Sequence, residues 1–165
     1  EETLVTFQVD FHLPHQFKLE YVGEDGERHE PIIVHRGVIS TMERMVALLI
    51  EEYEGNFPLW LSPVQAMVIP IADRHIEYAN EVAAQLRSHK LRVEVDTRGE
   101  RMNAKIRDAQ LRKIPYMLVV GDREAEAKAA ALRVRGGGDL GAVPVVEIVE
   151  RLRRERDEKV MMVGA

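Results

Sequence analysis

The chain has 165 residues, of which 45% are hydrophobic, 31% charged and 5% aromatic, a size suited to one compact domain and part of a second. It contains no cysteine, which excludes disulfides, thiolate zinc clusters and a cysteine nucleophile. No apolar run approaches the roughly 20 residues needed to span a bilayer, and the first residues lack the features of a secretion signal. We therefore expect a cytoplasmic protein with no membrane association.

Charge is distributed unevenly along the chain, whose formal net charge is -5. Residues 1–57 carry four Lys/Arg against twelve Asp/Glu, whereas residues 58–165 carry nineteen against sixteen. This asymmetry predicts two units with different partners, and the basic second unit is the better candidate for binding a polyanion. The alternative is an ordinary solubilising mixture of surface charges.

Residues near the start alternate between apolar and polar side chains, which is typical of antiparallel strands. The alternation is strict over residues 5–11 and predicts a half-buried strand that Pro14 ends. It resumes over residues 17–21, and after a turn at 23–26 a third strand is expected over residues 32–35. The pattern therefore predicts an antiparallel meander.

A helix and then a change of pattern follow this meander. Ser40, three residues before Glu43, predicts a capping box for an amphipathic helix over residues 42–53, which Gly55 ends. From Pro58 onward strands and helices alternate, which indicates a domain boundary and an α/β unit of about 100 residues.

The second unit is expected to contain two overlapping βαβ units. Residues 130–135 are expected to form an edge strand, followed by a flexible glycine turn at 136–138. A phosphate-loop interpretation of these glycines is rejected because no Lys-Ser/Thr follows them. The other expected elements are strands over residues 65–71, 91–95 and 116–120, and helices from Asp73, over residues 102–112 and from Pro144.

Basic residues are densest between Thr97 and Lys113. This cluster begins where a parallel strand should end, which is where α/β sheets bind ligands, so Arg98 and Arg101 are well placed to meet phosphates or base edges. Lys105 is expected to continue the basic surface along the helix. The alternative is a solvated helix face whose Arg and Glu residues pair with one another.

Other polar residues allow two interpretations. Arg133 and Arg135 share one face of the expected edge strand and can complement the basic cluster, or they can guard the edge against pairing. His35 ends an apolar strand and is more often a hydrogen-bonded histidine than a metal ligand. Arg44, at the start of a helix, is either a surface charge or a phosphate-binding residue.

Several motifs together resemble the bacterial threonyl-tRNA synthetases, and the resemblance covers nearly the whole chain. The stretch from His35 to Arg44 is similar to the third signature motif of class II aminoacyl-tRNA synthetases. The remaining motifs are Phe7-Gln8-Val9-Asp10-Phe11, Tyr21-Val22-Gly23-Glu24-Asp25-Gly26, Pro58-Leu59-Trp60-Leu61-Ser62-Pro63-Val64-Gln65, Lys105-Ile106-Arg107, Pro115-Tyr116-Met117-Leu118-Val119-Val120-Gly121-Asp122 and Asp139-Leu140-Gly141.

The resemblance implies roles for three residues of the first unit. Arg44 would contact the triphosphate of ATP, Gln8 would line the aminoacylation site, and His35 would be one of three zinc ligands. The other two ligands in the family, a cysteine and a histidine, lie earlier in the catalytic domain, as do the first and second signature motifs. The resemblance thus implies a homodimeric parent enzyme that uses ATP with Mg²⁺, and a carboxy-terminal fragment that is itself inactive.

The resemblance also implies the fold and the function of the second unit. The expected fold class is α/β, a five-stranded mixed sheet flanked by three helices, preceded by a partial antiparallel catalytic remnant with one helix. Residues 1–57 would be the end of the catalytic domain and residues 58–165 the anticodon-binding domain. The anticodon stem-loop of threonine tRNA would be read by Glu124, Arg133 and the loop from Arg98 to Arg101.

One departure and one alternative accompany this resemblance. Gly99 stands where the family usually has asparagine, so one expected base contact is absent or supplied by the backbone. The alternative function is a non-catalytic tRNA-binding accessory module, a truncated synthetase paralogue. Because Glu1 lies in mid-strand without an initiator methionine, the sequence favours a piece of the enzyme over the paralogue.

Overall fold

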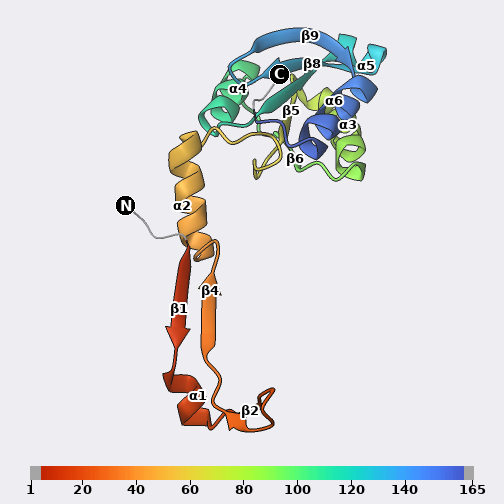
Figure 1. Ribbon diagram of the computed structural model, residues 1–165. Coiled ribbons are helices and arrows are strands. Elements are labelled where there is room, and N and C mark those ends of the chain that lie inside the picture. The colour runs from red at the N-terminus through yellow and green to blue at the C-terminus, as the bar shows by residue number, and fades with distance from the viewer. Residues whose placement is uncertain (1–4, 162–165) are drawn as a thin grey trace. The chain divides into compact units, whose positions relative to one another are not determined.

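Two compact units make up the chain, with the division between Glu52 and Tyr53. The structure is a computed structural model that describes residues 5–161, shown as a ribbon in Figure 1. Within the described range, no helix is long and apolar enough to cross a membrane.

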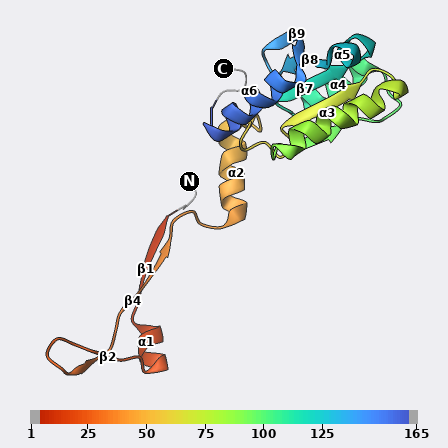
Figure 2. The same cartoon turned by 90° about the vertical axis from the view of Figure 1, so that its right-hand side faces the viewer.

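A two-stranded antiparallel ribbon of β1 and β4 forms the body of the first unit. Its register pairs Gln8 with His35 and Asp10 with Ile33, so the strand predicted over residues 5–11 is confirmed. The predicted half-burial is wrong, because Phe7 and Val9 on the apolar face are 65% and 53% exposed. Beyond the ribbon lie α1 and the β2–β3 hairpin (Figure 2). The elements are β1 (Thr6–Asp10), α1 (His12–Phe17), β2 (Tyr21–Val22), β3 (Arg28–His29), β4 (Ile33–Gly37) and α2 (Met42–Tyr53).

The predicted meander is wrong between these two strands. The carboxylate of Asp10 accepts hydrogen bonds from the backbone N–H groups of His12 and Leu13, at 2.8 and 3.0 Å, and this starts α1 where a strand restart was expected. Lys18 ends the helix in a left-handed conformation with φ 49°. Local capping by Asp10 therefore outweighs the alternation of residues 17–21.

The helix α2 begins at Met42 as predicted, but Thr41 caps it in place of the predicted Ser40. Ser40 has φ 60°, and the hydroxyl of Thr41 accepts the hydrogen bond from the backbone N–H of Arg44 at 3.4 Å. None of the residues of α2 is buried, and Met42 is 76% exposed. The apolar face that the sequence predicts for this helix is thus left uncovered by the described residues.

A five-stranded mixed sheet with strand order β6-β5-β7-β8-β9 organises the second unit. Three parallel strands form one side of it, β5 (Ala66–Pro70), β6 (Val93–Val95) and β7 (Tyr116–Val120). The antiparallel strands β8 (Ala129–Val134) and β9 (Gly138–Pro144) complete it. The helical elements are the 3-10 turn η1 (Asp73–His75), α3 (Ile76–Ser88), α4 (Met102–Leu111), α5 (Asp122–Ala127) and α6 (Val145–Asp157).

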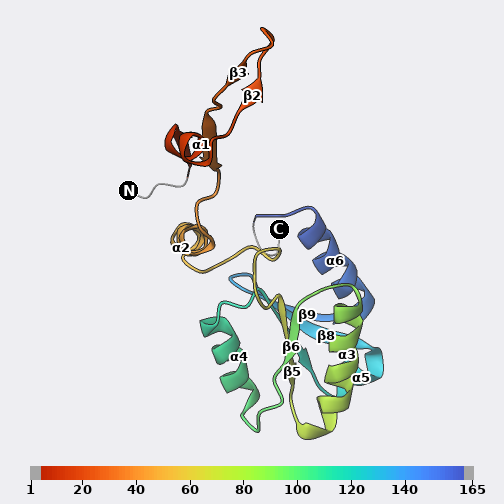
Figure 3. The same ribbon diagram turned by 90° about the horizontal axis from the view of Figure 1, so that it is seen from below.

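Helices cover both faces of this sheet, with α4 on one side and α3 and α6 on the other (Figure 3). The larger core joins α3 and α6 to alternate sheet residues such as Val68, Leu118 and Leu132. The smaller core joins Ile106 of α4 to the opposite face at Met67 and Met117. This is the predicted α/β class, a mixed sheet with helices, and α5 is an additional short helix.

The sheet edge differs from the prediction. Residues 129–134 form β8, which lies between β7 and β9 and is therefore not an edge strand. The edge on this side of the sheet is β9, which begins at the third glycine of the predicted turn and contains an irregularity opposite residues 131–133. Gly141 has φ 78° at this irregularity, a conformation that disfavours other residues. A strand this rich in glycine carries little apolar alternation, which is why the sequence pattern misses it.

Candidate nucleic-acid interface

One edge of the sheet collects the loops of the second unit that carry polar and basic residues. Because β5, β6 and β7 run parallel, their carboxyl ends lie at the same edge. The segments that follow these strands are residues 71–75, 96–101 and 121–124. Ligands commonly bind at this edge in open α/β sheets.

Arg98 is held tightly within the loop after β6. Its Nε donates to Asp96 Oδ1 at 2.9 Å, one terminal nitrogen donates to Asp96 Oδ2 at 2.6 Å, and the other donates to Asp108 Oδ2 at 2.8 Å. The Arg98 side chain is nevertheless 52% exposed. The hydrogen bonds from Arg98 hold the pKa of Asp96 below its ordinary value. The guanidinium is thus both oriented and accessible.

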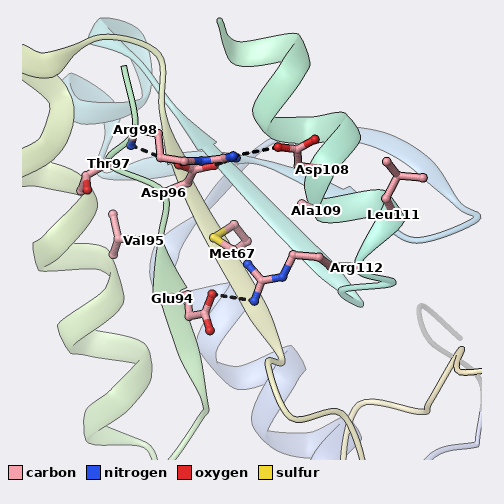
Figure 4. Close-up of a pocket in the computed structure, with 10 residues that line it drawn as sticks. All are labelled: Met67, Glu94, Val95, Asp96, Thr97, Arg98, Asp108, Ala109, Leu111 and Arg112. Carbon is pink, nitrogen blue, oxygen red and sulfur yellow. Dashed lines mark hydrogen bonds and ion pairs between the residues drawn. The ribbon is translucent and has the colours of Figure 1, made fainter. Parts of the chain in front are cut away.

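This guanidinium spans a cavity of about 500 Å³ between β6 and α4 (Figure 4). A second bridge crosses the same cavity, from Arg112 of α4 to Glu94 of β6 at 2.8 Å. Met67 lies on the strand behind it. Both arginines are therefore paired with carboxylates, across α4 and β6 or the loop after it and not along one face of the helix.

Lys105 does not belong to the exposed basic surface, so that prediction is wrong. Its side chain is 4% exposed, and its Nζ donates to the backbone carbonyls of Asp96 at 3.1 Å and Pro70 at 3.3 Å. These carbonyls lie at the ends of β6 and β5. Lys105 therefore fastens the two strand ends from which the candidate interface emerges, while Arg101 is exposed at the start of α4.

Glu124 lies in the first turn of α5, directly after β7. Its Oε2 accepts a hydrogen bond from the backbone N–H of Gly121 at 3.0 Å, which orients the carboxylate back toward the strand end. A Cβ on Gly121 would lie 2.8 Å from Cδ1 of Ile71 and 3.0 Å from this carboxylate oxygen. The absence of a side chain at Gly121 thus permits the position of Glu124.

Arg133 lies on the open part of the sheet face that α4 covers elsewhere. It pairs with Met117 of β7 in register, and its Nε and one terminal nitrogen donate to Asp139 Oδ2 of β9 at 3.2 and 3.0 Å. The pKa of Asp139 is lowered by the backbone N–H of Gly141 and by Arg133. The side chain of Arg133 is 34% exposed and can offer its fork to a ligand above the sheet.

Arg135 does not complement Arg133. Its guanidinium donates to the backbone carbonyls of Lys113, Asn56 and Phe57, at 2.5, 3.0 and 2.7 Å. These bonds fasten the segment that leads into the sheet. Arg135 therefore has a structural role, and it neither joins the basic cluster nor guards an edge.

The predicted residues fall into two places on the second unit. Glu124 and the loop from Arg98 to Arg101 share the carboxyl edge. Arg133 pairs with Met117, the second residue of β7, and therefore does not reach the carboxyl edge. Its strand β8 is also three strand spacings from β6, about 14 Å at the usual spacing between strands. A ligand that contacts all of them must therefore extend across the sheet, as an RNA loop does.

The sequence analysis missed a further group at the carboxyl edge. The carboxylate of Asp122 accepts hydrogen bonds from Arg74 Nε at 3.0 Å, from a terminal nitrogen of Arg74 at 2.6 Å and from His75 Nε2 at 2.8 Å. The available signals in the sequence were Asp-Arg-His after the strand β5 and Gly-Asp after β7, its neighbour in the sheet. Neither signal shows by itself that the two segments meet.

Gln8 and His35 of the first unit lie opposite each other in the β1–β4 ribbon. Directly paired residues of antiparallel strands share a face, so the structure brings these two predicted residues together. The pKa of Asp10 is lowered by the backbone N–H of Leu13 and then by His35, whose Nε2 lies 3.1 Å from Asp10 Oδ2. Arg44 lies in the first turn of α2, and its side chain is exposed.

The described residues do not fit a zinc site by themselves. Residues 5–161 contain no group of three or more His, Asp or Glu side chains arranged to hold a metal ion. The imidazole of His35 bonds to the carboxylate of Asp10, and this pair is one hydrogen bond and not a coordination sphere.

Comparison with known families matches both units. Residues 65–155 match a model described as "Anticodon binding domain". Residues 1–53 match a model described as "tRNA synthetase class II core domain (G, H, P, S and T)".

Curated relatives include several bacterial proteins named threonine–tRNA ligase. The chain is 52% identical over 153 residues to the protein from Natranaerobius thermophilus, which covers 93% of the chain and 24% of that protein. It is 48% identical over 159 residues to the protein from Thermus thermophilus, which covers 96% of the chain and 24% of that protein. The chain thus spans about a quarter of the length of these relatives.

Solved structures show the same fold. The RNA-binding domain of threonyl-tRNA synthetase from Cryptosporidium parvum superposes with a TM-score of 0.75 at 32% identity, covering 98% of the chain and 40% of that structure. Prolyl-tRNA synthetase from the same organism superposes with a TM-score of 0.68 at 20% identity, covering 88% of the chain and 31% of that structure. The latter similarity concerns the fold alone.

Proposed function

The chain belongs to the threonyl-tRNA synthetase family, with the end of the class II core followed by the anticodon-binding domain, and from this membership we propose that its second unit recognises the anticodon stem-loop of threonine tRNA. The observation that carries the proposal is the shared edge of the sheet, where Glu124 and the oriented Arg98 follow β7 and β6, the two parallel strands on either side of β5. Arg133 extends the same surface across the sheet. We propose residues 58–165 as the extent of this domain.

Three kinds of contact follow from the side chains on this surface. The carboxylate of Glu124 can accept from the ring or exocyclic N–H groups of a base, and the fork of Arg133 can donate to a guanine edge. Arg101, exposed at the start of α4, can contact phosphates, and Arg98 presents an oriented guanidinium beside it. Base contacts supply selectivity, whereas phosphate contacts supply affinity and sensitivity to salt.

We also propose that the first unit, residues 1–57, belongs to a threonine–tRNA ligase that activates threonine with ATP and Mg²⁺ and transfers it to tRNA. Arg44 would bind the triphosphate of ATP, and Gln8 would line the aminoacylation site on the same face as His35. His35 would serve as one zinc ligand only if further ligands join it, because the described residues do not complete a site. The 165 residues alone would neither activate threonine nor hold zinc tightly.

Binding to RNA tests this function. The 165-residue chain is titrated against an anticodon stem-loop with the threonine anticodon and against one with the second and third anticodon bases changed, at two salt concentrations. Selective binding is expected, and Glu124→Ala or Arg133→Ala should each reduce the selectivity by a factor of about 5 to 100. Glu126→Ala, an exposed residue of the same helix, is the control. Equal binding of the two RNAs at both salt concentrations would contradict the proposal.

A further inference from the structure

A chain of hydrogen bonds links the turn after β5 to the start of α5. His75 is 4% exposed, and its Nδ1 accepts from the backbone N–H of Ala72 at 3.2 Å. Since Nδ1 is an acceptor, the ring proton lies on Nε2, which donates to Asp122 Oδ1 at 2.8 Å. A buried imidazole with a defined tautomer thus orients a carboxylate that is itself 62% exposed.

The same carboxylate holds Arg74 by a two-point fork. Arg74 Nε donates to Oδ1 of Asp122 at 3.0 Å, and a terminal nitrogen donates to Oδ2 at 2.6 Å. The Arg74 side chain remains 67% exposed. Within the described residues, its recorded hydrogen bonds use two of the five N–H donors of the guanidinium. The remaining donors have a fixed orientation because the fork determines the plane of the group.

Stability is a poor explanation for this arrangement. An exposed ion pair contributes little to folding, since water screens it and side-chain entropy opposes it. A buried histidine loses hydration and needs a partner, and here its Nε2 partner is the exposed carboxylate that holds Arg74. The arrangement is better explained as a means of keeping an exposed guanidinium in one orientation, as binding sites for anions require.

The position of Arg74 connects it to the proposed interface. Pro70 at the end of β5 pairs with Val120 at the end of β7, so the segments that carry Arg74 and Glu124 leave adjacent strands at the same edge. Asp122 stands two residues before Glu124 in α5. An RNA loop whose base reaches Glu124 therefore brings its backbone phosphates near this edge.

On the basis of the proposed function, we propose that Arg74 is a preorganised phosphate-binding residue of the anticodon interface, held by Asp122 and with His75 as a positioning residue. The ligand is a phosphodiester group of the RNA loop, bound by the guanidinium as a charge-assisted contact. Because phosphate groups carry no base identity, Arg74 contributes affinity and not selectivity.

Binding of the full chain to the two anticodon stem-loops, titrated over a series of salt concentrations, tests this role. Arg74→Ala is expected to weaken binding to both RNAs by the same factor, about five- to tenfold, and to reduce the slope of log affinity against log salt by about 0.7 to 0.9. Arg153→Ala, which removes an exposed arginine from α6, is the matched control and should leave both quantities unchanged. Since Arg74 is exposed, its removal does not disturb the core.

Two further variants separate positioning from simple charge. Asp122→Ala removes a negative charge near the RNA, so net charge alone predicts tighter binding, whereas loss of the fork predicts weaker binding. His75→Gln retains an N–H donor for Asp122 and should bind RNA better than His75→Leu. Thermal melting of each variant shows whether it is folded. If His75→Leu does not fold, the RNA affinity of Asp122→Ala tests whether Arg74 must be positioned by its fork.

The outcomes distinguish this inference from the function on which it rests. If the unchanged chain binds the threonine stem-loop selectively but Arg74→Ala keeps its affinity and salt slope, the inference is overturned and the proposed function stands. Tighter binding by Asp122→Ala would overturn the positioning role. If the unchanged chain shows no selective binding, the proposed function fails and the inference fails with it.

Discussion

Arg98 holds Asp96 through both carboxylate oxygens, at 2.9 and 2.6 Å, within a loop that is also the predicted place of RNA contact. Asp96 is 8% exposed, and its Oδ1 additionally accepts from the backbone N–H of Arg98 at 3.2 Å. The order of the loop and the orientation of the guanidinium therefore depend on the same contact. Any change at this pair should affect stability as well as RNA binding.

Asp96→Ala is expected to lower the free energy of unfolding at pH 7 by about 2 kcal/mol, because the loop and Arg98 both lose their charged acceptor. Urea unfolding followed by the fluorescence of Trp60 measures this, since Trp60 is the single tryptophan of the chain. Asp108→Ala, which removes the more exposed and singly bonded partner of Arg98, is the control and should lose less.

The same variant has a predictable pH dependence. The folded state lowers the pKa of Asp96, chiefly through the hydrogen bonds from Arg98, so the contribution to stability is present above the ordinary carboxyl pKa and is lost as the pH falls through the lowered value. The difference between the unchanged chain and Asp96→Ala should thus shrink below about pH 4. A difference that stays constant from pH 7 to pH 3 would contradict this account.

Tyr116→Phe should destabilise the second unit by about 1 to 3 kcal/mol. The fully buried hydroxyl of Tyr116 donates to Glu155 Oε2, and its removal deprives a buried carboxylate of a donor. Tyr21→Phe, on an exposed strand, is the control. Urea unfolding monitored at Trp60 gives the comparison, and equal effects of the two variants would show that the buried hydrogen bond contributes nothing.

Alkaline conditions test the same hydroxyl independently. Burial, and then the carboxylate of Glu155, raise the pKa of Tyr116 above its ordinary value of 10. The neutral hydroxyl therefore stabilises the folded state below that pH, and the stability is lost as the pH rises above it. The fall in stability between pH 9 and 11 should be smaller in Tyr116→Phe than in the unchanged chain.

Gly99→Asn is expected to strengthen selective RNA binding roughly five- to tenfold, by placing at this position the asparagine that the resemblance to the family implies. A Cβ at Gly99 meets no heavy atom within 4 Å, so the substitution fits without strain. Titration against the two stem-loops measures the gain, with Gly99→Ala as the control for the loss of backbone freedom. Equal affinities of the two variants would show that the asparagine amide makes no base contact here.

The first unit should cause self-association of the chain at high concentration. Phe7 and Phe11 are 65% and 64% exposed, and α2 has no buried residue. Apolar surface of this extent, together with strand edges, favours association. Sedimentation velocity should show larger species at higher concentration for residues 1–165, whereas residues 58–165 should remain monomeric. A concentration-independent monomer for the full chain would contradict the prediction.

The periodicity of apolar residues was sufficient to predict those helices and strands whose buried apolar side chains determine their structure. The strand at residues 116–120 and the three long helices α3, α4 and α6 follow their apolar pattern, and the structure confirms them. The pattern failed where a capping hydrogen bond or glycine residues determine the structure. Asp10 starts a helix where the alternation indicated a strand, and the glycine-rich β9 has no apolar alternation that would predict it. These elements depend on single hydrogen bonds and on pairing with distant strands.

The candidate site shows the same division. The sequence alone determined the α/β class, through the periodicity of its apolar residues, and the resemblance to the family, through the motifs it shares with it. Only the tertiary structure decided which charges face the solvent: it buried Lys105 between two strand ends, tied Arg135 to backbone carbonyls and brought Arg74 and His75 to Asp122. Residues 47 or 48 positions apart meet there because parallel strands place their carboxyl ends at one edge, a proximity that the spacing of residues along the chain does not encode.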